Sequence, residues 1–278
     1  MSAVNQVEIP SVLQRFEYKY LIPREMIKPI SDFVKTYCYL DKYSEMSPTK
    51  FYRINNVYFD TPFYTFLNNR LEKKENRFNM RIRSYGENPV PPYFWEVKCK
   101  FGENKQKYRV KVKSEEIEKI FYMTKASDEL GLKRNDAKNM DLFQSLALSY
   151  NAQPQILTQY DRMAWISQAD EYARVTFDAN LQCCEEHNFN VRPVPERMES
   201  YDTTSIFGYG IDCILELKGQ VSNLPFWMID LVQKFDLKKT AFSKFRYGML
   251  RVLRNRMPDN KWYNVFDNGD IYDRLFNC

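Results

Sequence analysis

The segment at residues 105–113, KQKYRVKVK, constrains the fold more than any other part of the chain. Side chains of a β-strand point alternately to its two faces. As a strand, this segment would carry only Lys and Arg on one face, and Tyr108, Val110 and Val112 on the other. A similar alternation of charged and apolar residues recurs in RFEYKYLI at 15–22, MRIRSYG at 80–86, FWEVKCK at 94–100, YDRMAW at 160–165, ARVTFD at 173–178 and ILELKG at 214–219.

A single strand of this kind is typical of an antiparallel sheet with one solvated polar face. The whole set, in which Arg, Lys and Glu occur in short pairs on many strands, indicates instead that the charged faces share an interior. We therefore predict an α+β fold. Its centre would be a closed antiparallel β-barrel of about eight strands, with a charged interior and an apolar outside wrapped by helices.

Patterning along the chain predicts the individual elements. Strands are expected at 12–22, 50–60, 77–85, 93–101, 105–113, 155–167, 172–177, about 181–185, and 211–219. Helices are expected at 23–38, 61–71, 223–236 and 241–255, with two or three more within 114–150, and 187–210 as a long loop. Tyr58 and Asp60 should pack at a strand end and cap the next helix. We predict a single domain at 1–257 and a tail at 258–278 that packs on it.

Composition excludes several classes of function. The 278 residues include 41 basic and 36 acidic ones, and the net charge of +5 is too mild for a general polyanion binder. His187 is the one histidine of the chain, which argues against catalytic triads and His-rich metal sites. None of the six cysteines forms a CxxC pair, and no secretory signal or bilayer-spanning apolar run is visible. We therefore expect a cytoplasmic protein with free thiols.

Cations outnumber glutamates on the predicted charged faces. Gathering many cations in an interior costs free energy unless they stay hydrated or pair with an anion. Guanidinium groups match the geometry of phosphate oxygens. The interleaved glutamates could hold a hard divalent cation, which binds oxygen ligands and bridges phosphates. The expected ligand is therefore a highly charged phosphate compound, and the same glutamates argue against nucleic acid.

The order of nine segments resembles the VTC domain of polyphosphate polymerases, within the triphosphate tunnel metalloenzyme superfamily. They are RFEYKYLI at 15–22, YFDTP at 58–62, MRIRSYG at 80–86, FWEVKCK at 94–100, KYRVKV at 107–112, YDRMAW at 160–165, ARVTFD at 173–178, ILELKG at 214–219 and FSKFRYG at 242–248. Arg15 stands where the related CYTH branch carries the first Glu of its ExExK motif, which argues against a thiamine-triphosphatase or adenylate-cyclase function. The chain resembles the stand-alone bacterial form, without an SPX region or membrane segments.

The resemblance implies a set of tunnel residues that handle the phosphates. The expected catalytic residues are Lys19, Arg81, Arg83, Lys98, Arg162 and Lys244. The expected phosphate-binding residues are Lys107, Arg109, Lys218 and Ser243, and strand parity leaves open whether Lys107 or Arg109 faces the phosphate. Glu216 matches the metal-binding glutamate of the family, while Glu17 either joins it as a ligand or pairs with a neighbouring cation.

The resemblance also implies the reaction. Members of the family use ATP and a divalent metal, Mn²⁺ or Mg²⁺, and transfer the γ-phosphate to a growing polyphosphate chain. Such a site has to position two anions and neutralise their charge, and an ionised phosphate acceptor needs no general base. Water as acceptor would give a triphosphate hydrolase, and loss of turnover would leave a polyphosphate-binding module. A membrane-protein partner is frequent in the family, and no feature of this sequence identifies one.

Overall fold

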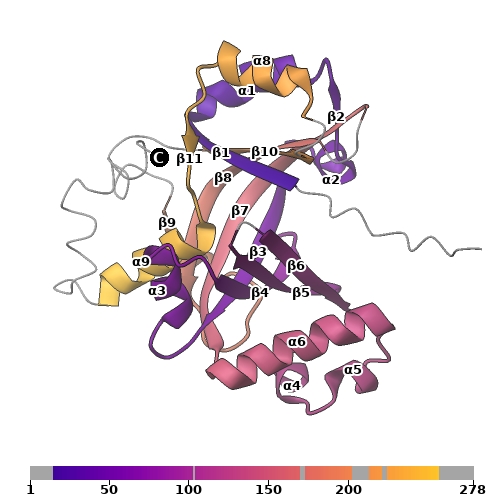
Figure 1. Cartoon of the computed structure of the whole chain (residues 1–278), viewed down its shortest axis with the longest axis vertical. Coiled ribbons are helices and arrows are strands. Elements are labelled where there is room, and N and C mark those ends of the chain that lie inside the picture. The colour runs from indigo at the N-terminus through magenta and orange to yellow at the C-terminus, as the bar shows by residue number, and fades with distance from the viewer. Residues whose placement is uncertain (1–14, 103, 170–172, 202–212, 221–223, 257–278) are drawn as a thin grey trace, which may run out of the picture.

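The computed structural model describes residues 15–102, 104–169, 173–201, 213–220 and 224–256 (Figure 1). Its strands are β1 (Arg15–Ile22), β2 (Cys38–Leu40), β3 (Tyr52–Asp60), β4 (Arg77–Tyr85), β5 (Tyr93–Phe101), β6 (Asn104–Val112), β7 (Gln153–Ser167), β8 (Arg174–Glu185), β9 (Glu199–Ser200), β10 (Cys213–Gln220) and β11 (Lys239–Thr240). Its helices are α1 (Ile27–Val34), α2 (Lys42–Met46), α3 (Thr65–Leu71), α4 (Ile117–Tyr122), α5 (Ala126–Glu129), α6 (Arg134–Tyr150), α8 (Phe226–Lys234) and α9 (Lys244–Arg256), with 3₁₀ turns at Arg24–Met26 and Pro195–Arg197.

All eleven strands belong to one antiparallel sheet, in the order β11-β1-β10-β8-β7-β3-β4-β5-β6, with β2 on β7 and β9 on β8. The predicted closed barrel of about eight strands is therefore wrong. The sheet is open, and β6 and β11 lie at its two ends without pairing to each other among the described residues. The physical reason lies on β6, where Lys105 and Lys111 keep exposed side chains. An edge strand rich in hydrated cations resists pairing with a further strand.

The open sheet is nevertheless bent. The two longest strands, β7 and β8, cross its middle, and their register shifts between Gln159 and Asp161. A β-bulge of this kind bends and twists a strand. The bend brings the two halves of the sheet toward each other. As a result, Glu17 on β1 interacts electrostatically with Lys98 on β5, although five strands separate β1 from β5 in the sheet order.

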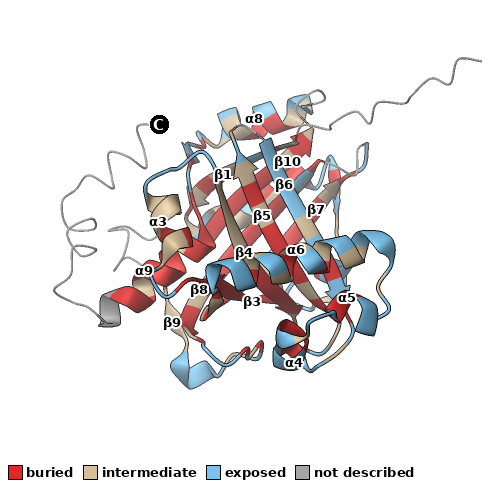
Figure 2. Ribbon diagram, turned by 60° about the horizontal axis from the view of Figure 1, so that its bottom comes forward, coloured by how far each residue is buried: buried red, intermediate tan, exposed pale blue. Residues whose placement is uncertain are grey.

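Two apolar clusters anchor helices to the sheet. One contains Phe59, Trp95 and Phe143 and joins β3 and β5 to α6. The other contains Phe16, Ile30 and Leu231 and joins β1 to α1 and α8. Figure 2 shows the outer faces of α6 and α8 exposed, the strands β3 and β5 largely buried, and the edge strand β6 exposed along much of its length.

Several element predictions differ from the structure. The segments predicted as two strands at 172–177 and 181–185 form the single strand β8, which passes through Asn180 in the left-handed region at φ 53°. The helix predicted at 23–38 ends at Val34, because Cys38–Leu40 pairs with β7 as β2. The tail at 258–278 lies outside the described residues, and the single-domain organisation stays a prediction. None of the described helices is long and apolar enough to cross a bilayer.

Candidate anion-binding site

One face of the sheet collects the charged side chains that strand parity predicted, and we call it the charged face. Antiparallel register makes neighbours of side chains from adjacent strands, such as Arg81 opposite Glu96, and Arg162 opposite Asp178. The face is built from alternate residues of seven strands and from the first residue of α9. Its members are Glu17, Lys19, Arg81, Arg83, Glu96, Lys98, Lys107, Arg109, Arg162, Asp178, Glu216, Lys218 and Lys244.

Glu96 is the centre of one group of ions on β4, β5 and β6. Its fully buried carboxylate lies 2.5 Å from Arg81 Nη2, 2.5 Å from Lys107 Nζ and 3.3 Å from Arg109 Nε. Burial disfavours the charge of Glu96, but the neighbouring cations hold its pKa far below the usual range. The hydroxyl of Tyr58 accepts a further hydrogen bond from Arg81, at 3.0 Å. Lys107 and Arg109 both lie on the charged face and pair with Glu96, so the structure does not decide which of the two would face a phosphate.

Asp178 and Glu216 form the centre of a second group on β7, β8 and β10. Arg162 donates two parallel hydrogen bonds to Asp178, at 2.6 and 2.7 Å, and Lys244 donates another at 2.5 Å. Lys244 Nζ also lies 3.5 Å from Glu216. Burial alone would raise the pKa of Asp178, but the charges of Arg162 and Lys244 hold it below its ordinary value. Lys244 therefore links carboxylates on two neighbouring strands.

Glu216 is surrounded by cations from β1, β7, β10 and α9. Lys218 lies 2.5 Å from it, Lys19 3.5 Å and Arg162 3.6 Å, in addition to Lys244. Despite burial, these cations hold the pKa of Glu216 well below its usual range. Glu96, Asp178 and Glu216 are therefore each shared among several cations.

Arg83 and Lys98 differ from the other cations, since neither forms an ion pair with a carboxylate in the described parts of the chain. Arg83 donates instead to Asn56 Oδ1 at 2.9 Å and to the hydroxyl of Tyr160 at 3.3 Å. The charge of Arg81 and burial together hold the pKa of Lys98 well below its ordinary value. Two cations among like charges leave the middle of the face with excess positive potential, which a bound anion would neutralise.

The start of α9 lies against this face. Ser243 caps the helix, because its Oγ accepts a hydrogen bond from the backbone N–H of Arg246 at 3.3 Å. The next residue, Lys244, extends onto Asp178. Lys19 holds the preceding segment by donating to the Phe242 carbonyl oxygen at 2.9 Å. The positive end of the α9 dipole thus adds to the potential of the charged face.

The carboxylates that could hold a divalent metal are Glu17 and Glu216. Both flank Lys19, at 3.2 and 3.5 Å from its Nζ. Lys19 lowers the pKa of Glu17 to about 2 against the effect of burial, so both carboxylates are anionic at neutral pH. No three His, Cys, Asp or Glu side chains gather into a metal-binding group in the described segments. Two carboxylates nevertheless suit Mg²⁺ or Mn²⁺, which take their remaining ligands from phosphates and water.

Aromatic side chains mark one end of the charged face, near the C-terminal end of β4. Tyr43 from α2 stacks on Tyr85 with ring centroids 6.3 Å apart, and Tyr52 lies beside both. Phe94 meets Tyr85 edge to face, while the Arg109 guanidinium lies 3.8 Å above the Phe94 ring. Tyr43 is 63% exposed. Together these residues form a surface on which a planar ring could stack.

All the predicted phosphate and metal residues lie on or beside the charged face, while their individual roles stay predictions. Sequence reasoning assigned no role to Glu96 and Asp178, which organise the two ion groups. Parity did place both on the charged face, but nothing local indicated which cations they would hold. The predicted capping by Asp60 is confirmed, since its carboxylate accepts hydrogen bonds from the backbone N–H groups of Phe66 and Leu67 in the first turn of α3, and from that of Thr61 before the helix. His187 lies off the face, against the Pro154 carbonyl oxygen.

The VTC domain family matches residues 14–253, which is most of the chain and includes every member of the charged face. This chain belongs to the VTC domain family. Among curated proteins, this VTC domain is 26% identical over 229 residues to the vacuolar transporter chaperone complex subunit 4 of Trypanosoma cruzi. That match covers 70% of this chain and 28% of the Trypanosoma protein, so the chain spans less than a third of that relative.

Two solved structures are also similar to this VTC domain. One is a provisionally named adenylate cyclase from Vibrio parahaemolyticus, with a TM-score of 0.43, 11% identity, and coverage of 84% of this chain and 97% of that one. The other is a provisionally named adenylate cyclase from Bacillus halodurans, with a TM-score of 0.46, 12% identity, and coverage of 83% and 94%. Scores at this level do not establish a shared fold.

Proposed function

We propose that this VTC domain is a polyphosphate polymerase that transfers the γ-phosphate of ATP to a growing polyphosphate chain on the charged face. The observation that carries the proposal is the excess of positive charge there. Arg83 and Lys98 have no carboxylate partner within the described segments, and the surrounding cations outnumber the carboxylates. A face of this kind suits two polyanions that would otherwise repel each other.

The charged face would hold the donor and acceptor phosphates in position and neutralise their negative charge. Catalytic roles are proposed for Lys19, Arg81, Arg83, Lys98, Arg162 and Lys244, and phosphate binding for Lys107, Arg109, Lys218 and Ser243. Holding donor and acceptor phosphates in line supplies much of the rate enhancement in phosphoryl transfer, and cations stabilise the charge on the equatorial oxygens. The acceptor phosphate is already ionised at neutral pH. The absence of a histidine from the charged face is therefore compatible with the reaction.

Glu216 and Glu17 are the residues that would hold Mn²⁺ or Mg²⁺ beside the phosphates. A bound divalent ion would neutralise phosphate charge as a Lewis acid. The stacking surface of Tyr43 and Tyr85 would receive the adenine base. We further propose that the domain works in the cytoplasm, beside a membrane protein that moves the product. The Trypanosoma relative is named as a subunit of a complex, which supports the existence of a partner.

The test is a polymer assay. The purified protein is incubated with ATP, Mn²⁺ and a short polyphosphate primer, and products are separated on a polyphosphate-stained gel. Lys244→Met is compared with Lys28→Met as a matched control, because Lys28 lies on α1 with an 81% exposed side chain. The proposal expects a ladder from the wild type and the control, and none from Lys244→Met. Orthophosphate without a ladder would indicate a triphosphate hydrolase, and binding without either product would indicate a binding module.

A further inference from the structure

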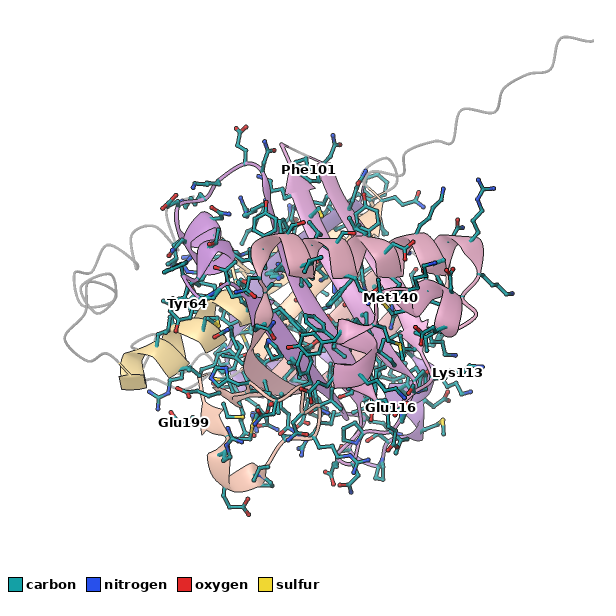
Figure 3. All side chains as sticks on the ribbon, turned by 90° about the horizontal axis from the view of Figure 1, so that it is seen from below. Tyr64, Phe101, Lys113, Glu116, Met140 and Glu199 are labelled. Atoms are coloured by element: carbon teal, nitrogen blue, oxygen red, sulfur yellow. The ribbon has the colours of Figure 1, made fainter. Side chains whose placement is uncertain are left out.

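Three arginines gather beyond the charged face, where α3, β4 and α9 meet. They are Arg70 at the end of α3, Arg77 at the start of β4 and Arg246 in the first turn of α9, and we call them the arginine corner. Helix α3 contacts both β4 and α9. Figures 1 and 3 show α3, which Tyr64 marks in Figure 3, lying beside α9.

Among the residues that the structure describes, the arginine corner has no acidic counterpart of its own. None of its three guanidinium groups forms an ion pair in the described part of the chain, although all three residues are half-buried. The Arg77 guanidinium donates to the Lys74 carbonyl oxygen. The Nε atoms of Arg77 and Arg246 are buried and have no hydrogen-bond partner within the described segments. A buried N–H donor without an acceptor lowers the stability of the folded state, so these donors could bind the oxygens of a ligand.

Electrostatics within the corner is repulsive. Burial, followed by the charges of Arg77 and Arg246, lowers the pKa of Arg70 to about 10. Glu17, on the charged face, and Tyr58 are the groups that oppose this shift. Like charges at a half-buried position destabilise a folded protein unless an anion neutralises them. The arrangement therefore favours a ligand with several negative charges.

Strand geometry places the corner in line with the charged face. Arg77 shares its face of β4 with Arg81 and Arg83, because side chains two residues apart point to the same side. At ~3.3 Å per residue, Arg77 lies roughly 13 Å from Arg81 along the strand, and Tyr85, on the stacking surface, lies roughly 26 Å from Arg77. Cross-strand pairing adds Lys100 opposite Arg77, and Lys105 opposite Lys100. A row of cations thus continues from the middle of the face toward the corner.

We propose that the arginine corner is a second anion-binding site, which holds the polyphosphate chain beyond the reaction centre while the nucleotide lies toward Tyr85. This inference rests on the proposed function, because it assumes that a phosphate polymer is the product. A triphosphate at the centre of the charged face would not extend to the corner, whereas a longer chain would. The corner therefore distinguishes long from short phosphate chains.

The experiment measures affinity for tripolyphosphate and for a long polyphosphate chain by titration calorimetry, on the full chain and without metal. Arg77→Gln and Arg246→Gln are compared with Arg134→Gln, whose arginine is exposed on α6. Each corner variant should weaken binding of the long chain about tenfold, as expected for loss of a charge-assisted hydrogen bond. Binding of tripolyphosphate should stay within about twofold of the wild type. Arg77→Lys keeps the charge but loses the planar fork, so its effect should be smaller.

A melting temperature for each variant separates binding from folding. Removing one of three repelling charges should leave the melting temperature unchanged or raise it, whereas a decrease would show a structural role and overturn the proposal. Equal losses for short and long chains would also overturn it, because the corner would then be part of the central site. Displacement of the long chain by single-stranded RNA at equal phosphate concentration would contradict polyphosphate as its ligand.

The failure of the proposed function would look different. If neither tripolyphosphate nor the long chain binds the wild type, the charged face is not a phosphate site and both proposals fail. If both bind and the corner variants match Arg134→Gln, the proposed function stands and the assignment of the corner alone is wrong.

Discussion

Lys244 Nζ lies 2.5 Å from Asp178 Oδ2 and 3.5 Å from Glu216 Oε1, so one ammonium joins two carboxylates on neighbouring strands. Lys244→Met removes this charge but keeps most of the side-chain volume. Asp178 keeps its paired hydrogen bonds from Arg162, so the loss of stability should be limited to about 1.5–3 kcal/mol. Transfer of phosphate should fall at least about 100-fold, as for loss of one preorganised electrostatic contact. Urea unfolding and a polymer assay measure the two effects, and wild-type turnover in the variant would contradict the role of Lys244.

Glu96 is the carboxylate that holds Arg81, Lys107 and Arg109 together. Glu96→Gln should destabilise the fold by about 3–5 kcal/mol, because it leaves the buried guanidinium of Arg81 without its counter-charge. Tripolyphosphate should restore part of that stability, since an anion that binds the folded state stabilises it. Thermal unfolding with and without tripolyphosphate checks this. An equal or smaller gain in the variant than in the wild type would mean that the ligand does not meet these cations.

Binding of phosphate should depend on the protonation of Lys107. Burial, together with the charges of Arg81 and Arg83, lowers the pKa of Lys107 to about 7. A bound polyanion favours the ammonium form of Lys107 and raises its pKa. Above pH 7, the amine of Lys107 therefore takes up a proton when the polyanion binds. Affinity for tripolyphosphate should therefore fall by up to about tenfold per pH unit as pH rises through 7.

Lys107→Arg is the control, because a guanidinium stays charged throughout this range. Titration of the phosphate itself affects both proteins equally, so the difference between their pH profiles isolates Lys107. Identical profiles from pH 6 to 9 would show that Lys107 does not titrate near 7.

Glu17 has two alternative roles that a metal titration separates. As a ligand beside Glu216, its replacement by Gln should raise the Mn²⁺ concentration needed for half-maximal activity by about tenfold or more. As a mere partner of Lys19, the same change would leave the Mn²⁺ requirement unaltered. Activity as a function of Mn²⁺ after chelator treatment gives the answer. Glu25→Gln is a suitable control, because Glu25 is an exposed glutamate outside the charged face.

Tyr43 tests the stacking surface. Its exposed ring stacks on Tyr85, so Tyr43→Ala should leave the apolar core intact. Loss of stacking on a base is worth about 1–3 kcal/mol, so the KM for ATP should rise about tenfold. Affinity for tripolyphosphate, which has no base, should not change. An equal effect on both ligands would show that Tyr43 acts on the phosphates or on the fold.

Prediction from the sequence was most successful where the physics is local. Alternation along a strand depends only on backbone geometry, so Arg81 and Arg83, or Glu216 and Lys218, were placed on one face without any knowledge of the fold. The boundaries of β4 and β5 agree with the predicted 77–85 and 93–101 for the same reason. Asp60 as a helix cap likewise involves backbone groups only a few residues away.

The amino-acid sequence by itself determined which side chains share the charged face. The alternation of side chains along a strand depends only on neighbouring residues, and the order of the motifs is read directly from the sequence. Only the tertiary structure decided that the sheet stays open, since closure depends on how β7 and β8 bend and on the solvation of β6. It also decided which cations of the described segments pair with a carboxylate and which do not. Lys98 and the arginine corner owe their excess charge to contacts between segments far apart in the chain, such as Arg70 with Arg246, and no local pattern encodes them.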